Sequence, residues 1–149
     1  MEMNITFPGD KKVNAHFKGF TVETDQPVAA GGEGSAPSPF DLFLASVGTC
    51  AGFYVLRFCQ ERGIPTQDLK VSLDTKRRQG SGLIGEIDIE ISLPAQFPEK
   101  YRGSVKRAAD LCAVKQHLEN PPQIEISTIV AESRVADLSN NGLAKALSS

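Results

Sequence analysis

The stretch SPFDLFLASVGTCAGFYVLRFCQERG, residues 38–63, decides the fold. Ser38 is a typical helix N-cap, and Pro39 suits the first helical position because its missing N–H needs no partner there. Asp41 brings a negative charge to the first turn, where the helix dipole favours it. A glycine and then a proline follow the apolar run, so the sequence predicts one long helix over residues 39–62.

Apolar side chains occupy every side of this predicted helix. A helix that is apolar all round is buried on all sides, and a single 149-residue domain with one sheet has too little material to cover it. We therefore expect a second subunit to cover part of it. The uncharged run is only 15 residues long (42–56), whereas a membrane-spanning helix needs about 20, so we expect a core helix and no membrane partner.

Length and composition narrow the class of protein. The 149 residues fit a single domain, 1–149, with a C-terminal tail over about 132–149. A net charge of -2 favours neither nucleic acid nor an anionic membrane as a partner. Three cysteines are too few for a disulfide scaffold, and the first residues lack the basic and apolar pattern of a secretory signal. The expected location is the reducing cytoplasm.

The rest of the chain predicts an α+β fold with antiparallel sheets. Five segments alternate polar and apolar residues as strands do: residues 4–7, 12–17, 20–24, 69–76 and 83–93. A second helix begins at Pro98 with one apolar face, and residues 112–118 either continue it or open a new short helix. The last predicted strand covers residues 123–130.

The cysteines are the first candidates for chemistry. Cys50 has small neighbours that leave room for another group to approach its sulfur, although a lone cysteine is often a small buried apolar residue. Cys59 follows nine residues later, on the opposite side of the helix, which favours a packing role. If a helix opens at Cys112, its dipole would favour a thiolate there, and Lys115 and His117 either add positive potential or are simply solvated.

Other site types have no matching pattern in the sequence. There is no C-x-x-C or H-x-x-x-H spacing that would indicate a metal site. The glycine-rich segment 31–34 lacks the P-loop pattern, and there is no G-x-S-x-G elbow of a serine hydrolase. We therefore expect no metal and no cofactor.

Two segments together resemble a known family. The first is residues 31–50, with APSP at 36–39, DLFLAS at 41–46 and GTC at 48–50; the second is CAVKQHL at 112–118, followed by two prolines. Both are similar to the OsmC/Ohr family of thiol-dependent peroxidases, and closer to its OsmC-like branch than to Ohr. The order of predicted elements is also similar, and the resemblance extends to about Val130.

The resemblance implies a fold and a chemistry. The fold would be an intertwined α+β homodimer, with antiparallel sheets packed on a long central helix that carries a cysteine. Cys50 would attack the O–O bond of an organic hydroperoxide as a thiolate, and its sulfenic acid would form a disulfide with Cys112. A dithiol reductant would then reopen that disulfide. Asp41, Lys115 and His117 are candidate supporting residues.

The sequence also departs from the pattern of the family. Phe40 stands where Ohr-type enzymes have a glutamate, ten residues before the reactive cysteine, and its neighbour Asp41 is a candidate substitute. Ohr-type enzymes also supply an arginine from their N-terminal strands, whereas the first arginine here is Arg57. The alternative interpretation is therefore a non-enzymatic dimer of the same fold, which binds a small ligand or senses stress through the Cys50 thiol.

Overall fold

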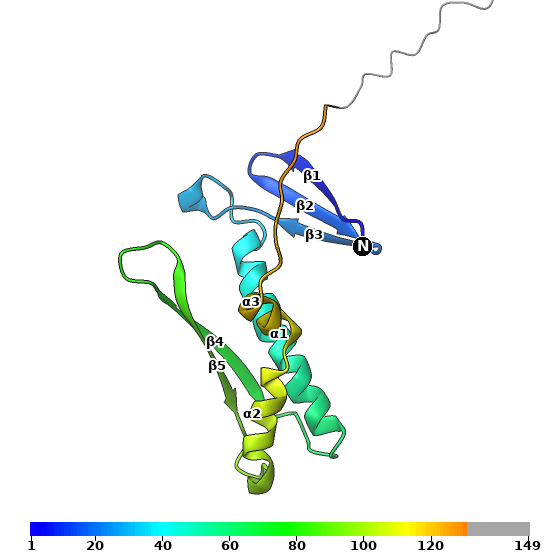
Figure 1. The fold of residues 1–149 in the computed structure, drawn as a ribbon, viewed down its shortest axis with the longest axis vertical. Coiled ribbons are helices and arrows are strands. Elements are labelled where there is room, and N and C mark those ends of the chain that lie inside the picture. The colour runs from blue at the N-terminus through cyan, green and yellow to red at the C-terminus, as the bar shows by residue number, and fades with distance from the viewer. Residues whose placement is uncertain (131–149) are drawn as a thin grey trace, which may run out of the picture.

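The computed structural model describes residues 1–130 and has an α+β architecture with two antiparallel sheets (Figure 1). The predicted tail, about 132–149, lies outside the described residues. The first sheet, sheet A, contains three strands in the order β1-β2-β3, and β4 and β5 form a separate hairpin. The strands are β1 (Asn4–Gly9), β2 (Lys12–Phe17), β3 (Phe20–Thr24), β4 (Lys70–Arg77) and β5 (Ile84–Ser92). The longer helices are α1 (Pro39–Gln60), α2 (Arg102–Asp110) and α3 (Ala113–Glu119), and the 3-10 turns are η1 (Val28–Ala30) and η2 (Glu99–Tyr101).

The long helix α1 begins as predicted and ends two residues earlier. Ser38 and Asp41 form a capping box: the Asp41 N–H donates to Ser38 Oγ over 3.2 Å, and the Ser38 N–H donates to Asp41 Oδ2 over 2.9 Å. At the other end, Gly63 has a φ of +63°, which glycine adopts without steric cost. This turn lets the Ile64 N–H reach back to the Cys59 carbonyl oxygen over 2.9 Å, which stops the helix.

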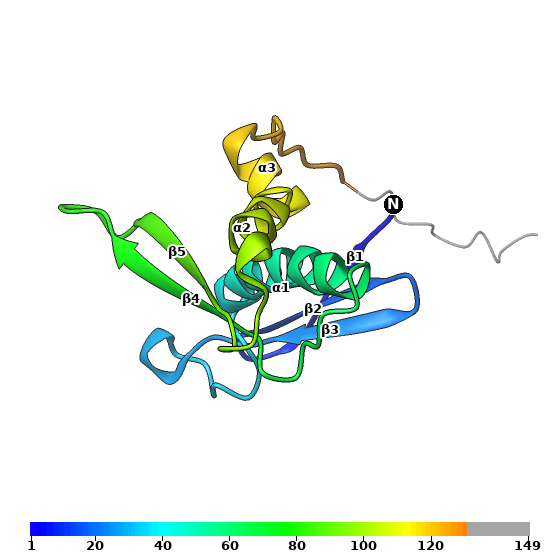
Figure 2. The ribbon, with the colours of Figure 1, turned by 90° about the horizontal axis from the view of Figure 1, so that it is seen from below.

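The hairpin and two helices enclose the main core. Buried side chains from α1 pack against Val105 of α2 and Phe97, which precedes η2. Apolar residues of the hairpin, including Val71 and Ile91, cover this cluster. Cys59 is buried in it, as expected for a packing residue, and burial raises the pKa of its thiol. Figure 2 shows α2 and α3 on one side of α1, with sheet A beyond it.

The basic end of β4 faces the acidic strand β5. The Lys76 ammonium lies 3.0 Å from a Glu86 carboxylate oxygen and 2.8 Å from one of Asp88. These hydrogen bonds and charges raise the pKa of Lys76 above its usual value. All three side chains are exposed, so the cluster stabilises the hairpin only slightly.

A buried carboxylate organises the loop that leads into α1. Asp25 is 1 % exposed and accepts hydrogen bonds from the backbone N–H groups of Gln26, Glu33 and Ser35 and from the Ser35 hydroxyl. These bonds hold the pKa of Asp25 at about 2, against burial, which raises it. Gly32 is required here because a Cβ atom at this position would lie 2.0 Å from the Gln26 carbonyl oxygen.

The prediction of a final strand over residues 123–130 is wrong for the single chain. These residues belong to no strand or helix and are exposed, as in the case of Ile126 at 93 %. The alternation of apolar residues suits a strand, but a strand also needs a neighbour to accept and donate its backbone hydrogen bonds. Among the described residues of one chain, this segment pairs with no strand of either sheet.

Within residues 1–130 of one chain, α1 is covered on some sides and exposed on another, and its cover by a second subunit stays a prediction. Its length and composition alone would suit a membrane span, but α2, α3 and β4 pack against it. One stripe on the remaining surface stays exposed, and it includes Phe53 at 56 % and Leu56 at 40 %. We call this stripe the α1 stripe; it consists of Ala45, Thr49, Phe53 and Leu56, which recur at helical spacing.

Candidate functional site

The structure brings Cys50 and Cys112 together, although 62 positions separate them in the sequence. Cys50 lies on α1 and is half-buried, whereas Cys112 is fully buried at the N-cap of α3. The Sγ atom of Cys112 lies 3.9 Å from the carbonyl oxygen of Val47, three residues before Cys50 on α1. The two thiols therefore meet where α3 crosses α1.

The start of α3 resolves the alternative that the sequence left open. Residues 113–119 form a new helix rather than a continuation of α2, because the chain turns at Leu111 and Cys112. The Cys112 sulfur caps this helix by accepting the Lys115 N–H over 3.4 Å. The side chain of Cys112 therefore accepts a hydrogen bond from a backbone N–H in the first turn of its own helix, as an N-cap side chain does.

The first turn of α3 acts on Cys50. Burial alone would raise the pKa of Cys50, but the backbone N–H groups of Val114 and Ala113, together with the Cys112 thiol, lower it below its usual value. Backbone N–H groups that point at a sulfur favour its thiolate because they stabilise the negative charge. The Cys50 sulfur is therefore the more acidic member of the pair.

The pKa of Cys112 shifts in the opposite direction. Burial raises it, the Lys115 N–H lowers it, and the neighbouring Cys50 raises it again. Cys50 therefore ionises more readily than Cys112. A sulfur that ionises more readily, next to a second thiol, suits thiol–disulfide chemistry, in which the thiolate is the attacking group.

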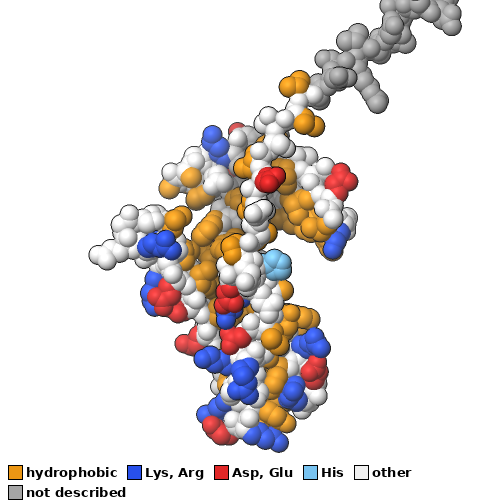
Figure 3. Space-filling model, in the orientation of Figure 1, with side chains coloured by type: hydrophobic (Ala, Val, Ile, Leu, Met, Phe, Trp, Pro, Cys, Tyr) orange, Lys and Arg blue, Asp and Glu red, His pale blue; other side chains and the backbone are white. Residues whose placement is uncertain are grey.

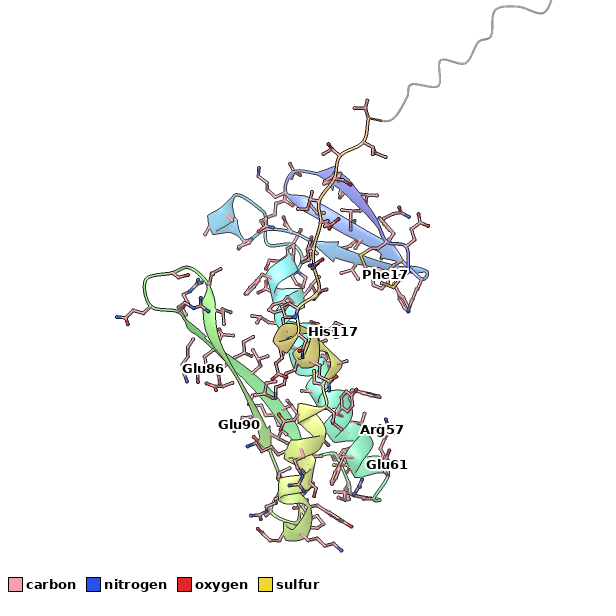
Figure 4. All side chains as sticks on the ribbon, in the orientation of Figure 1. Phe17, Arg57, Glu61, Glu86, Glu90 and His117 are labelled. Carbon is pink, nitrogen blue, oxygen red and sulfur yellow. The ribbon has the colours of Figure 1, made fainter. Side chains whose placement is uncertain are left out.

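The three candidate supporting residues hold other partners in the structure. Asp41 caps α1, and hydrogen bonds from the Ser38 hydroxyl and N–H lower its pKa. The Lys115 ammonium lies 2.7 Å from an Asp110 carboxylate oxygen and 3.7 Å from one of Glu119. His117 is exposed in the last turn of α3, with its Nδ1 2.7 Å from the Ala113 carbonyl oxygen (Figure 4). A contribution of these three side chains to the chemistry of Cys50 stays a prediction.

Two groups that lower the pKa of Cys50, the N–H groups of Ala113 and Val114, are not among the residues predicted from the sequence. The predicted effect of the helix dipole was on Cys112, the nearest sulfur in the sequence. A possible helix start after Cys112 was the only signal for these groups. These N–H groups reach the Cys50 sulfur only because α3 packs across α1, and this packing cannot be predicted from a local sequence pattern.

Comparisons with known proteins identify the family of the chain. The family model described as "OsmC-like protein" matches residues 32–127, a range that contains both Cys50 and Cys112. No curated protein matches the chain.

Several solved structures share the fold. A protein from Psychrobacter arcticus, described as an osmotic stress induced and detoxification response protein, has a TM-score of 0.65 at 22% identity, covering 76% of this chain and 85% of that one. An organic hydroperoxide resistance protein from Elizabethkingia anophelis has a TM-score of 0.56 at 16% identity, with 81% and 90% covered. An organic hydroperoxide resistance protein OsmC from Legionella pneumophila has a TM-score of 0.50 at 15% identity, with 78% and 87% covered.

The match to the family model extends over more than half of the chain, and it includes the long helix, the hairpin and the helix that Cys112 caps. The resemblance inferred from the sequence is thus confirmed, and the chain belongs to the family of OsmC-like proteins.

Proposed function

We propose that this protein reduces organic hydroperoxides through Cys50 and Cys112. The observation that supports this most directly is the opposite shift of the two thiol pKa values, downward for Cys50 and upward for Cys112. The membership of the chain in a family with organic hydroperoxide resistance proteins among its structural neighbours gives independent support.

The first step oxidises Cys50. Its thiolate attacks one oxygen of the O–O bond, which breaks as the new S–O bond forms. The other oxygen leaves as an alkoxide and takes up a proton to give the alcohol. The products are a sulfenic acid on Cys50 and one alcohol, so the peroxide gains the two electrons that the sulfur loses.

The second step uses the buried Cys112. Its sulfur attacks the sulfenic sulfur, the S–O bond breaks, and water leaves with the thiol proton of Cys112. The disulfide between Cys50 and Cys112 is then reduced by an external dithiol, which becomes a cyclic disulfide and restores both thiols. The cytoplasm, which we propose as the compartment, holds such reductants.

We further propose that the working unit is an intertwined homodimer. Within residues 1–130, three apolar surfaces are exposed: the α1 stripe, one face of sheet A that includes Phe7 and Phe20, and the segment 123–130. Figure 3 shows hydrophobic side chains at the surface around sheet A and along the lower part of α1. Exposed apolar surface of this extent is typical of protein interfaces, and a second copy supplies matching surfaces by symmetry.

The test begins with fully reduced protein and tert-butyl hydroperoxide. We expect one alcohol per peroxide consumed, a dimedone-reactive sulfenic acid on Cys50 and then a Cys50–Cys112 disulfide, both mapped by mass spectrometry. The Cys50→Ser variant should lose turnover, whereas Cys59→Ser, which changes a core thiol, should retain it. If Cys50 forms neither product, the peroxidase proposal is wrong and the alternative of a ligand-binding or stress-sensing dimer takes its place.

A further inference from the structure

An ion pair bridges the corner between α2 and α3, where one of the two reactive cysteines lies. Asp110 is the last residue of α2, and Lys115 belongs to the first turn of α3. The Lys115 ammonium lies 2.7 Å from an Asp110 carboxylate oxygen, five residues back along the chain. Because its two members belong to different helices, this ion pair restrains the turn by which the chain passes from α2 into α3.

The corner that the ion pair spans contains Cys112. The chain leaves α2 at Leu111, and Cys112 adopts a ψ of 117° before α3 begins. The N–H of Cys112 donates to the Ala109 carbonyl oxygen over 3.1 Å, and its carbonyl oxygen accepts from the Gln116 N–H over 3.0 Å. The backbone of Cys112 is thus bonded to both helices, so its position depends on how the two helices meet at this corner.

Lys115 links the ion pair to the two sulfur atoms. Its backbone N–H donates to Cys112 Sγ over 3.4 Å, while its side chain belongs to the ion pair. The two preceding N–H groups, those of Ala113 and Val114, are the ones that lower the pKa of Cys50. All three N–H groups lie in the first turn of α3. A residue that holds Lys115 therefore also restrains the N–H groups on which the Cys50 thiolate depends.

Asp110 occupies a position where the dipole of its own helix disfavours a carboxylate. The C-terminal end of a helix carries partial negative charge, so a cation is the favourable residue there. The Lys115 ammonium compensates for this, and its hydrogen bond and charge lower the pKa of Asp110. Asp110 in turn raises the pKa of Lys115, so both groups are charged at neutral pH. The ion pair thus accounts for a carboxylate at the last position of α2.

We propose that Asp110 is a positioning residue: its ion pair with Lys115 holds the corner between α2 and α3, so that the first N–H groups of α3 point at the Cys50 sulfur. The effect is transmitted by geometry. Among residues 1–130, no Lys, Arg, Asp or Glu side chain is a cause of the lowered pKa of Cys50. The inference rests on the proposed function for the reaction at Cys50, but the ionisation of Cys50 is measured without that reaction.

The test is the pH profile of Cys50 alkylation by iodoacetamide in the Asp110→Asn variant, which keeps the shape of the side chain and removes its charge. Loss of positioning should move the Cys50 midpoint to higher pH and slow its alkylation at pH 7 about threefold, a size that a partly exposed ion pair can supply. A direct effect of charge has the opposite sign, because removing a nearby negative charge favours the thiolate. An unchanged or lower midpoint would overturn the proposal.

Three further variants isolate the ion pair. Glu119→Gln removes the second carboxylate near Lys115, whose oxygen lies 3.7 Å from the ammonium, and should leave the Cys50 midpoint unchanged. Lys115→Arg keeps an ion pair and should behave like the wild type. Exchanging the two charges, Asp110→Lys with Lys115→Asp, should restore the midpoint, since each charge then also suits the dipole of its own helix. A midpoint that stays raised in the exchanged variant, or an equal shift in Glu119→Gln, would contradict the proposal.

A kinetic measurement connects the ion pair to the proposed reaction. In single turnover at pH 7, oxidation of Cys50 by tert-butyl hydroperoxide should slow in Asp110→Asn by the same factor as alkylation, because both reactions use the thiolate. Oxidation that is unchanged despite slower alkylation would overturn the role of Asp110 in the reaction. A wild-type Cys50 that is not oxidised at all would refute the proposed function but leave the alkylation result standing.

Discussion

The Sγ atom of Cys112 lies 3.9 Å from the carbonyl oxygen of Val47. The N-cap residue of α3 therefore contacts α1, the helix that carries Cys50. Val47 is buried and precedes Cys50 by less than one turn. This contact positions the Cys112 thiol beside the more acidic thiol of Cys50.

Replacing Cys112 should leave the oxidation of Cys50 intact but prevent formation of the Cys50–Cys112 disulfide. In Cys112→Ser, Cys50 is still oxidised by tert-butyl hydroperoxide, but its sulfenic acid has no thiol partner and proceeds to sulfinic acid. Mass spectrometry should show a gain of two oxygens on Cys50 and the loss of multiple turnovers. A Cys112→Ser variant that turns over as fast as the wild type would rule out Cys112 as the resolving residue.

The pH dependence of alkylation should distinguish the three thiols. Because the thiolate reacts with iodoacetamide, the rate for Cys50 should reach half its maximum below the reference cysteine pKa of 9.0. Cys112 and Cys59 should reach theirs above it, since burial raises both pKa values. The rates are measured for each peptide by mass spectrometry, and a Cys50 midpoint at or above that of Cys112 would contradict the assignment.

A proline at position 113 should raise the pKa of Cys50 without disturbing α3. Ala113 is the first helical residue, where proline is tolerated, and Cys112 before it is already extended, with ψ of 117°. Ala113→Pro removes one of the N–H groups that favour the Cys50 thiolate, so alkylation at neutral pH should slow several-fold. Ala113→Ser retains the N–H and is the matched control; equal rates for both variants would show that this N–H does not matter.

A charge on the α1 stripe should break the proposed dimer. Leu56→Glu places a carboxylate where the partner would pack, and burying it unpaired costs several kcal/mol, which is about a hundredfold or more in the dissociation constant. Light scattering after size exclusion should report the mass of one chain for this variant and of two chains for the wild type. Gln67→Glu, which introduces the same charge in an exposed loop, should remain dimeric. A wild-type chain that is monomeric at micromolar concentration would contradict the dimer.

Asp25 should make the free energy of unfolding depend on pH between about pH 4 and pH 2. Its pKa is about 2 in the folded protein, below the ordinary 3.8, so it stabilises the fold fully above about 3.8 and loses this contribution as the pH falls toward 2. At pH 7, Asp25→Asn should unfold at a lower temperature than the wild type, and the difference should shrink between pH 4 and pH 2. Glu23→Gln, a nearby exposed site, controls for charge alone. A difference that does not change with pH would show that the carboxylate charge is not what Asp25 contributes.

Local patterns were sufficient to predict most of the secondary structure. The N-cap at Ser38 and the strict alternation along the hairpin specify a helix and two strands through nearby atoms, so their predictions agree with the structure. The segment 123–130 fails for the opposite reason. Its alternation is equally clear, but a strand depends on a partner outside the segment.

The sequence by itself therefore determined most of the elements and the α+β class, and its resemblance to a family indicated the two reactive thiol candidates. Only the tertiary structure decided which thiol is the acidic one. That difference comes from the N–H groups of Ala113 and Val114 and from the depth at which Cys112 is buried. Hydrogen bonds and desolvation act over a few ångströms in space, whatever the separation along the chain, so the packing of α3 on α1 sets the chemistry of Cys50.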